Sequence, residues 1–206
     1  MEPWNLLSLP LPKRRFLVVA PRAANDLMLE LAARLALNAP LRILDGGNRS
    51  NLYPLARAIR RQTPRVHEAL GRVRVARAFT CYQMLSLLED VPAEAGPTLV
   101  LDLLATFYDE SVSLDESRML LRQALRELAR LSAQAPVVIS ASRPPEVARS
   151  REGLLDLLER NVDQSWVFEL PPAEPAPQLA LWPEFRQEDG GRQAVPTTRG
   201  EERYRR

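Results

Sequence analysis

The chain has 206 residues, of which 46% are hydrophobic and 26% are charged, and its formal net charge is +2 at pH 7. This length and composition predict a single folded domain of roughly 150 to 200 residues and exclude an intrinsically disordered scaffold. The uninterrupted apolar runs are too short to span a bilayer, and Lys13, Arg14 and Arg15 follow the apolar start instead of preceding it, so we expect neither a membrane span nor a signal peptide.

The cysteine and histidine counts exclude two further classes of protein. The single Cys81 cannot form an internal disulfide, and with the single His67 it provides no Cys/His zinc cage. We therefore expect a reduced, cytoplasmic protein. We also expect it to hold no metal and no cofactor.

Segments typical of buried strands alternate with segments of helical spacing from Arg15 to about Leu170, which predicts an α/β domain with a mostly parallel central sheet. The expected strands are 16–20, 41–44, 72–76, 98–103, 136–140 and 165–170. The expected helices are 26–37, 53–61, 81–89, 113–133 and 153–160, with a short turn at 66–70. Ser113 and Glu116 form a capping-box pattern at the start of the longest helix.

The composition changes after the last expected strand. Four prolines fall within residues 171–177, and the remainder is largely polar and charged. The sequence therefore predicts a domain over residues 1–170 and a disordered, proline-rich tail over residues 171–206.

The turn after the first strand lacks the residues that hold a nucleotide phosphate. A phosphate loop needs glycines, so that backbone N–H groups can wrap the phosphate, and a lysine that reaches its oxygens. Residues 21–26 contain neither, and Asp26 places a negative charge at the start of the next helix.

Three later segments resemble RecA/RadA-type recombinases and their paralogues. The run from Val75 to Thr80, followed by Gln83, resembles the segment after their third core strand. The run 99–102, which ends in Asp102, resembles their Walker B strand, and 137–140 resembles the strand that follows it. The resemblance implies a RecA-like, three-layer domain over about residues 16–170.

The chain departs from that family where ATP hydrolysis is performed. Residues 45–48, Asp-Gly-Gly-Asn, stand where the family has Asp-Thr-Glu-Gly with its catalytic glutamate, and residues 140–143, Ser-Ala-Ser-Arg, replace a polar sensor. Without the loop, lysine, base and sensor, most sources of phosphoryl-transfer rate are lost, so we expect a pseudo-ATPase with degenerate Walker motifs. Asp102, the Walker-B-like residue that remains, either caps a strand end or retains magnesium binding.

Arginines are concentrated between residues 49 and 77, where eight of them accompany one acidic residue, Glu68. A local excess of cations suits a DNA backbone, although a solvated surface or an acidic protein partner also fits. The candidate DNA-binding residues are Arg49, Arg57, Arg60, Arg61 and Arg77.

The tail contains an apolar island, Gln-Leu-Ala-Leu-Trp, at residues 178–182. It resembles the peptide by which bacterial polymerases and repair proteins bind the sliding clamp, with Gln178, Leu179, Leu181 and Trp182 as the contact residues. Two leucines and an aromatic ring can fill an apolar pocket on a partner; the alternative is a segment that folds back on the domain.

These patterns together predict a non-catalytic accessory protein of DNA repair, recombination or translesion synthesis. It resembles ATPase-deficient relatives of RecA such as the ImuA/SulA group, and its expected partners are DNA, the sliding clamp, a polymerase or a RecA-type recombinase. Two alternatives stay open: a residual nucleotide-binding ATPase with an altered phosphate loop, and a regulatory interaction protein without DNA contact.

Overall fold

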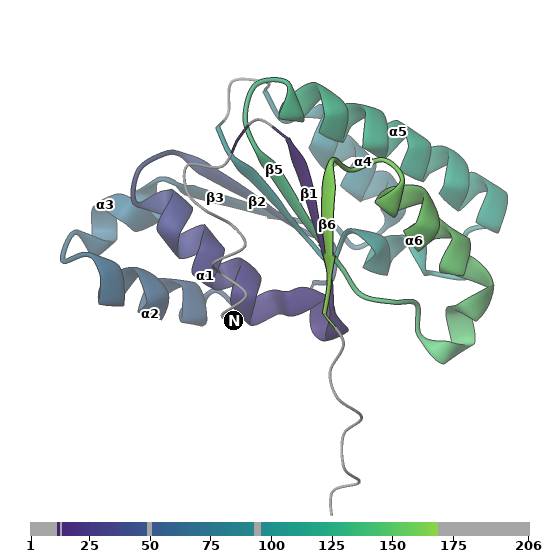
Figure 1. Cartoon of the computed structure of the whole chain (residues 1–206), viewed down its shortest axis with the longest axis horizontal. Coiled ribbons are helices and arrows are strands. Elements are labelled where there is room, and N and C mark those ends of the chain that lie inside the picture. Colours follow the sequence, from purple (N-terminus) through teal and green to yellow (C-terminus); the bar gives the residue numbers. More distant parts are fainter. Residues whose placement is uncertain (1–11, 13, 49–50, 93–95, 169–206) are drawn as a thin grey trace, which may run out of the picture. The chain divides into compact units, whose positions relative to one another are not determined.

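The computed structural model describes residues 12, 14–48, 51–92 and 96–168. They form a six-stranded, all-parallel sheet with the strand order β3-β2-β4-β5-β1-β6 (Figure 1). The strands are β1 (Arg15–Val19), β2 (Leu41–Asp45), β3 (Val73–Arg77), β4 (Thr98–Leu101), β5 (Val137–Ala141) and β6 (Gln164–Val167). The predicted α/β class and its parallel sheet are confirmed, and the described sheet has no antiparallel pair.

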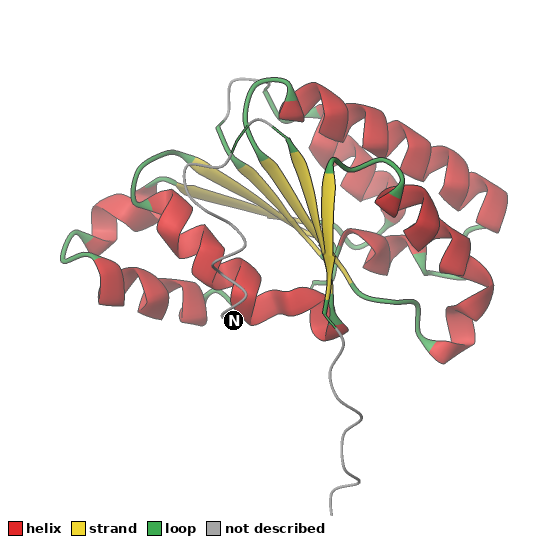
Figure 2. Ribbon diagram, in the orientation of Figure 1, coloured by secondary structure: helices red, strands yellow, loops and turns green. Residues whose placement is uncertain are grey.

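Helices cover both faces of this sheet, as Figure 2 shows in red on either side of the yellow strands. The helices are α1 (Asn25–Ala36), α2 (Tyr53–Gln62), α3 (Val66–Gly71), α4 (Cys81–Glu89), α5 (Leu114–Ser132) and α6 (Glu152–Glu159). One core cluster joins α1, α2 and α3 to the sheet, and a second cluster joins α4, α5 and α6 to it. Both faces of the central strands are therefore buried.

Strand β1 shows why the core strands are continuous apolar runs. Leu17 and Val19 belong to one core cluster, whereas Phe16 and Val18 belong to the other. Because successive side chains point to opposite faces, a strand covered on both faces is mainly apolar, with no alternation of apolar and polar residues. Strand β3 lies at the sheet edge, where Arg74 and Arg77 are exposed, and charged side chains at an edge disfavour pairing with another chain.

Local capping signals place the ends of two helices. Ser113 Oγ accepts a hydrogen bond from the Glu116 backbone N–H at the start of α5, which confirms the predicted capping residue. Thr80 Oγ1 accepts from the Gln83 N–H at the start of α4 in the same way. Each side chain satisfies a backbone N–H that the first turn of a helix leaves without a partner.

Most predicted elements agree with the structure to within one residue at each end, and three differ more. Strand β6 ends at Val167, and Phe168 lies outside it. Strand β4 ends at Leu101, two residues earlier than expected, because Asp102 adopts a left-handed conformation with φ 48° and ψ 55°. A short 3-10 helix (Leu103–Phe107) follows it. The turn expected at 66–70 is the helix α3, which spans six residues.

Two arginines tie neighbouring elements together from within the domain. Arg151 is 4% exposed and donates hydrogen bonds to Phe107 O, Ser117 Oγ and Val112 O. Arg130, on α5, donates to three carbonyl oxygens at the end of α4, those of Leu88, Glu89 and Val91. Their guanidinium groups supply the donors that these carbonyls would otherwise lack.

Four arginines, Arg118, Arg122, Arg126 and Arg130, recur every four residues along α5, and two of them pair with carboxylates of the same helix. Arg118 pairs with Asp115 at 3.4 Å, and Arg130 pairs with Glu127 at 2.6 Å. Such pairs offset the repulsion between like charges four residues apart. None of the described helices is both long enough and apolar enough to cross a lipid bilayer.

Candidate functional site

The carboxyl ends of the strands form the natural ligand site of this fold. The chain leaves β1 toward α1 on one face of the sheet, but it leaves the neighbouring strand β5 toward α6 on the other face. Where connections diverge in this way, a crevice opens beyond the strand ends, and open α/β sheets bind ligands there. The residues at the ends of β1, β2, β4 and β5 therefore decide what this edge can bind.

The turn after β1 uses its own backbone donors internally. The Ala23 N–H donates to Ala20 O at 2.9 Å, the Asn25 N–H donates to Arg22 O, and Pro21 has no N–H. A phosphate would need several such N–H groups directed at one point. Two of the turn's N–H groups are therefore already engaged and are not directed at a phosphate.

The same turn adopts an unusual conformation. Arg22, Ala23 and Ala24 have φ values of 53°, 51° and 49°, in the left-handed region that disfavours residues with a Cβ atom. Asp26 lies in the first turn of α1, directly after it. A carboxylate at this helix start suits the helix dipole and repels a phosphate.

The end of β2 packs closely against the end of β4. A Cβ atom on Gly46 would lie 2.8 Å from Asp102 O, and one on Gly47 would lie 3.1 Å from Asp102 Cβ. Neither position admits a larger residue without a shift of the backbone or of Asp102. The two glycines thus serve close packing.

Asp45, the last residue of β2, is 1% exposed, and its Oδ2 lies 3.5 Å from Arg77 Nε at the end of β3. The register pairs the same two residues across the neighbouring strands. A buried carboxylate is costly unless a cation and hydrogen bonds compensate its charge. Arg77 is therefore engaged in holding the ends of β2 and β3 together.

Asp102 joins the ends of β4 and β5. Its Oδ1 accepts hydrogen bonds from the Ser142 N–H at 3.1 Å and from Ser142 Oγ at 2.9 Å. Its own N–H donates to Ser140 Oγ at 3.0 Å. This arrangement supports the structural alternative for Asp102, in which the side chain caps a strand end.

Tyr108 also binds the residue that follows β5, because its hydroxyl donates to Ser142 O at 3.1 Å. Burial, followed by the charge of Asp102, raises the pKa of Tyr108 above its ordinary value. The phenol therefore stays protonated and remains a hydrogen-bond donor over the whole physiological pH range.

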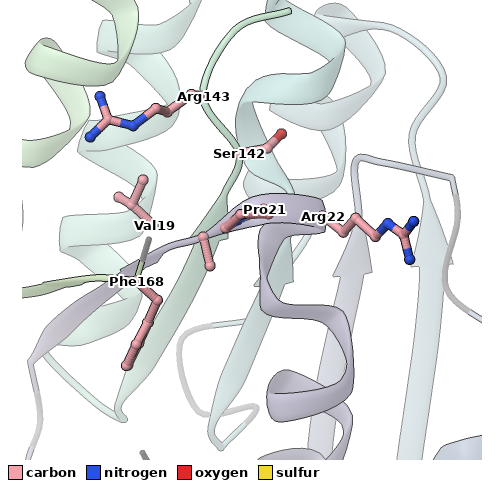
Figure 3. Close-up of a pocket in the computed structure, with 7 residues that line it drawn as sticks. Val19, Pro21, Arg22, Ser142, Arg143 and Phe168 are labelled. Atoms are coloured by element: carbon pink, nitrogen blue, oxygen red, sulfur yellow. The ribbon is translucent and has the colours of Figure 1, made fainter. Parts of the chain in front are cut away.

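Three pockets line this edge, and Arg22 borders all of them. The largest, of about 480 Å³, has apolar walls that include Val19, Pro21 and Phe168. Figure 3 shows Arg22 and Arg143 extending away from each other at opposite ends of this pocket. Because the two guanidinium groups do not converge, they do not form a clamp for one phosphate group.

The predicted DNA-binding arginines fall into three groups. Arg57 and Arg60 are exposed on α2, and no described carboxylate forms an ion pair with either of them. Arg61 pairs with Glu30 of α1 at 2.8 Å, and Arg77 pairs with Asp45. Arg49 lies outside the described residues, as do the tail residues Gln178, Leu179, Leu181 and Trp182.

The structure also brings forward residues that the sequence pattern did not assign to a site. Ser142 donates to Asp102, and Tyr108 donates to Ser142 O. Arg22 borders the three pockets, and Arg151 donates to Val112 O in the segment before α5. The hydrogen-bond partners of Tyr108, Ser142 and Arg151 are 34 to 44 positions away along the chain. The position of Ser142 just beyond a strand end was the one available signal.

Comparison with known proteins adds no assignment: no protein-family model matches the chain, and no curated protein matches it.

Proposed function

We propose that the chain is a non-catalytic accessory protein of DNA repair, recombination or translesion synthesis that acts by binding DNA, partner proteins or both. In this proposal the crevice at the carboxyl ends of the strands has a structural role and does not bind nucleotide. The exposed arginines of α2 contact DNA.

The loss of catalysis is supported by how the crevice residues are engaged. The Asp102 carboxylate accepts two hydrogen bonds from Ser142, and the turn after β1 uses two of its N–H groups internally. Phosphoryl transfer depends on positioned donors, a metal and a base around the phosphate. The parts present here hold the strand ends together, which argues against the alternative of a residual ATPase.

The exposed face of α2 carries the DNA-binding part of the proposal. Leu55, Ala58 and Ile59 are buried, whereas Arg57 and Arg60 are exposed on the opposite side of the helix. Cations without a neighbouring carboxylate can neutralise phosphates and release the counterions of DNA. Arg61 contributes less in this account because Glu30 already pairs with it.

The RecA-like part of the proposal is supported by the order of the elements. The all-parallel, two-sided sheet is compatible with a RecA-like domain, and the segments that resemble the recombinases form the β3–α4 junction, β4 and β5. Relatives of this kind act through active recombinases, polymerases or the sliding clamp, and the motif at 178–182 is our proposed contact for the clamp.

Replacing Arg57 and Arg60 together with alanine is expected to weaken DNA binding and to reduce the slope of log affinity against log salt by about 2, one unit for each lost phosphate contact. Fluorescence anisotropy with a labelled oligonucleotide at several salt concentrations measures both effects. Arg61→Ala should reduce the slope by less.

Exposed Arg122 and Arg126 on α5 provide the matched control, since their replacement by alanine also removes two positive charges. The proposal requires the α2 pair to matter more than the α5 pair. Equal losses from the two pairs would mean that DNA attraction is not localised on α2. An absence of measurable DNA binding by the native chain would remove DNA from the proposed function.

A further inference from the structure

Three large apolar side chains are exposed around the start of α4 and α5. Phe79 is 63% exposed, Tyr82 is 47% exposed and Met119 is 49% exposed. Phe79 directly precedes the N-cap of α4, Tyr82 lies in the first turn of α4, and Met119 lies on α5. We call these three residues the aromatic patch. Exposed apolar side chains that gather in one place mark contact surfaces more often than scattered ones do.

Helix packing and one hydrogen bond bring Tyr82 next to the first two turns of α5, where Met119 lies. Helices α4 and α5 pack side by side on the same face of the sheet (Figure 1). The Tyr82 hydroxyl donates to Glu116 Oε1 at 2.5 Å, and Glu116 and Met119 are three residues apart on one face of α5. The Phe79 N–H donates to Gln83 Oε1 at 2.8 Å, which fixes the Phe79 backbone at the start of α4, next to the first turn that carries Tyr82.

The patch is bordered by negative charge. Residues 109–116 contain four carboxylates, Asp109, Glu110, Asp115 and Glu116, and no basic residue. On the other side of Met119 the surface is basic, because Arg122 is exposed one turn further along α5, and Arg118 pairs with Asp115 at 3.4 Å. Hydrogen bonds from Ser111 lower the pKa of Asp109, which keeps that carboxylate ionised. The bond to Glu116 raises the pKa of Tyr82 to about 12, so the phenol remains a neutral donor. The patch is therefore acidic on the side of residues 109–116, where Asp109, Glu110 and Glu116 have no ion pair with a described basic residue.

We infer that the aromatic patch and its acidic border dock a cationic, amphipathic helix of a partner protein. Apolar side chains of such a helix would cover Phe79, Tyr82 and Met119, and its arginines would meet the carboxylates of residues 109–116 and the faces of the two aromatic rings. A nucleic acid does not suit this surface, because its phosphates would be repelled by the same carboxylates. The inference specifies the partner chemistry within the proposed function and concerns a surface separate from α2.

The test uses the full chain and a labelled helical peptide built only from leucine and arginine in an amphipathic pattern. Saturable, salt-sensitive binding is expected, and Tyr82→Ala combined with Met119→Ala should weaken it by about tenfold or more. Glu116→Gln should weaken binding and reduce its salt dependence, because one border charge is removed. The same peptide with glutamate in place of arginine should not bind.

Two variants separate this inference from a general effect of surface changes. Tyr53→Ala removes another exposed aromatic ring, 62% exposed on α2, and Glu146→Gln removes another exposed carboxylate. Both should bind the peptide as the native chain does. Unchanged binding by the Tyr82→Ala, Met119→Ala variant, at an unchanged melting temperature, would overturn the inference.

DNA binding by α2 and peptide binding by the aromatic patch are tested by different variants, so either one can be contradicted without the other. The patch variants should bind DNA like the native chain, and the Arg57→Ala, Arg60→Ala variant should bind the peptide like the native chain. Loss of peptide binding in the α2 variant would place the peptide on α2 and would likewise contradict the inference.

Discussion

Replacement of Arg151 with methionine is expected to lower the free energy of unfolding by about 3 kcal/mol, because three acceptors lose a charged donor. Arg151 Nη1 lies 2.9 Å from Phe107 O and 2.8 Å from Ser117 Oγ, and Nη2 donates to Val112 O. Methionine keeps much of the side-chain volume, so the loss reports the hydrogen bonds and not a cavity. Denaturant unfolding followed by circular dichroism measures the change.

Arg149 offers a control two positions away. It pairs with Glu146 at 3.0 Å, but both side chains are largely exposed, so Arg149→Ala should change stability by less than about 0.5 kcal/mol. Arg151→Lys keeps the charge but has fewer donors in fixed directions. Its free energy of unfolding should lie between those of the native chain and Arg151→Met. A methionine variant as stable as the native chain would show that solvent or a rearranged loop satisfies these acceptors.

Replacement of Asp102 with alanine is expected to destabilise the domain by about 2 to 3 kcal/mol. The Ser142 N–H loses a charged acceptor, and alanine takes over a backbone position with φ 48° that asparagine, aspartate and glycine tolerate better. Asp102→Asn keeps an acceptor oxygen and suits this φ, so it should cost about 1 kcal/mol.

Asp102→Gly separates the cost of the lost hydrogen-bond acceptor from the cost of backbone strain. Glycine removes the acceptor, but it adopts a φ of 48° without strain. It should be more stable than the alanine variant by about 1 kcal/mol. If Asp102 were instead a carboxylate reserved for a metal ion, its replacement would leave stability unchanged or raise it, as is common at functional sites. Thermal and denaturant unfolding of the three variants distinguish these accounts.

Much of the fold is predictable from local sequence because its determinants are local. Residues 16–19 of strand β1 are buried on both faces and therefore form an uninterrupted apolar run. Helix α5 carries its own start signal in Ser113 and Glu116. The parallel sheet follows from the alternation of strands and helices along the chain.

The candidate site was less predictable because its interactions connect distant segments. Asp102 is identifiable from sequence as a strand-end carboxylate. Its hydrogen-bond partner Ser142 is 40 positions further along the chain, and nothing near Asp102 in the sequence indicates that bond. The left-handed conformation of Asp102, with which β4 ends, also has no signal in the apolar run before it. Similarly, the eight arginines of residues 49–77 were evident, but the pairing of Arg61 with Glu30 depends on how α2 packs against α1.

The measurement that tests the central claim most directly is phosphate release from ATP and magnesium by the full chain, with and without DNA, together with the melting temperature under the same conditions. The account predicts release at the level of a protein-free sample and no stabilisation by ATP, since a ligand that binds the folded state must raise its stability. DNA-stimulated hydrolysis that Asp102→Asn abolishes without loss of folded protein would contradict it.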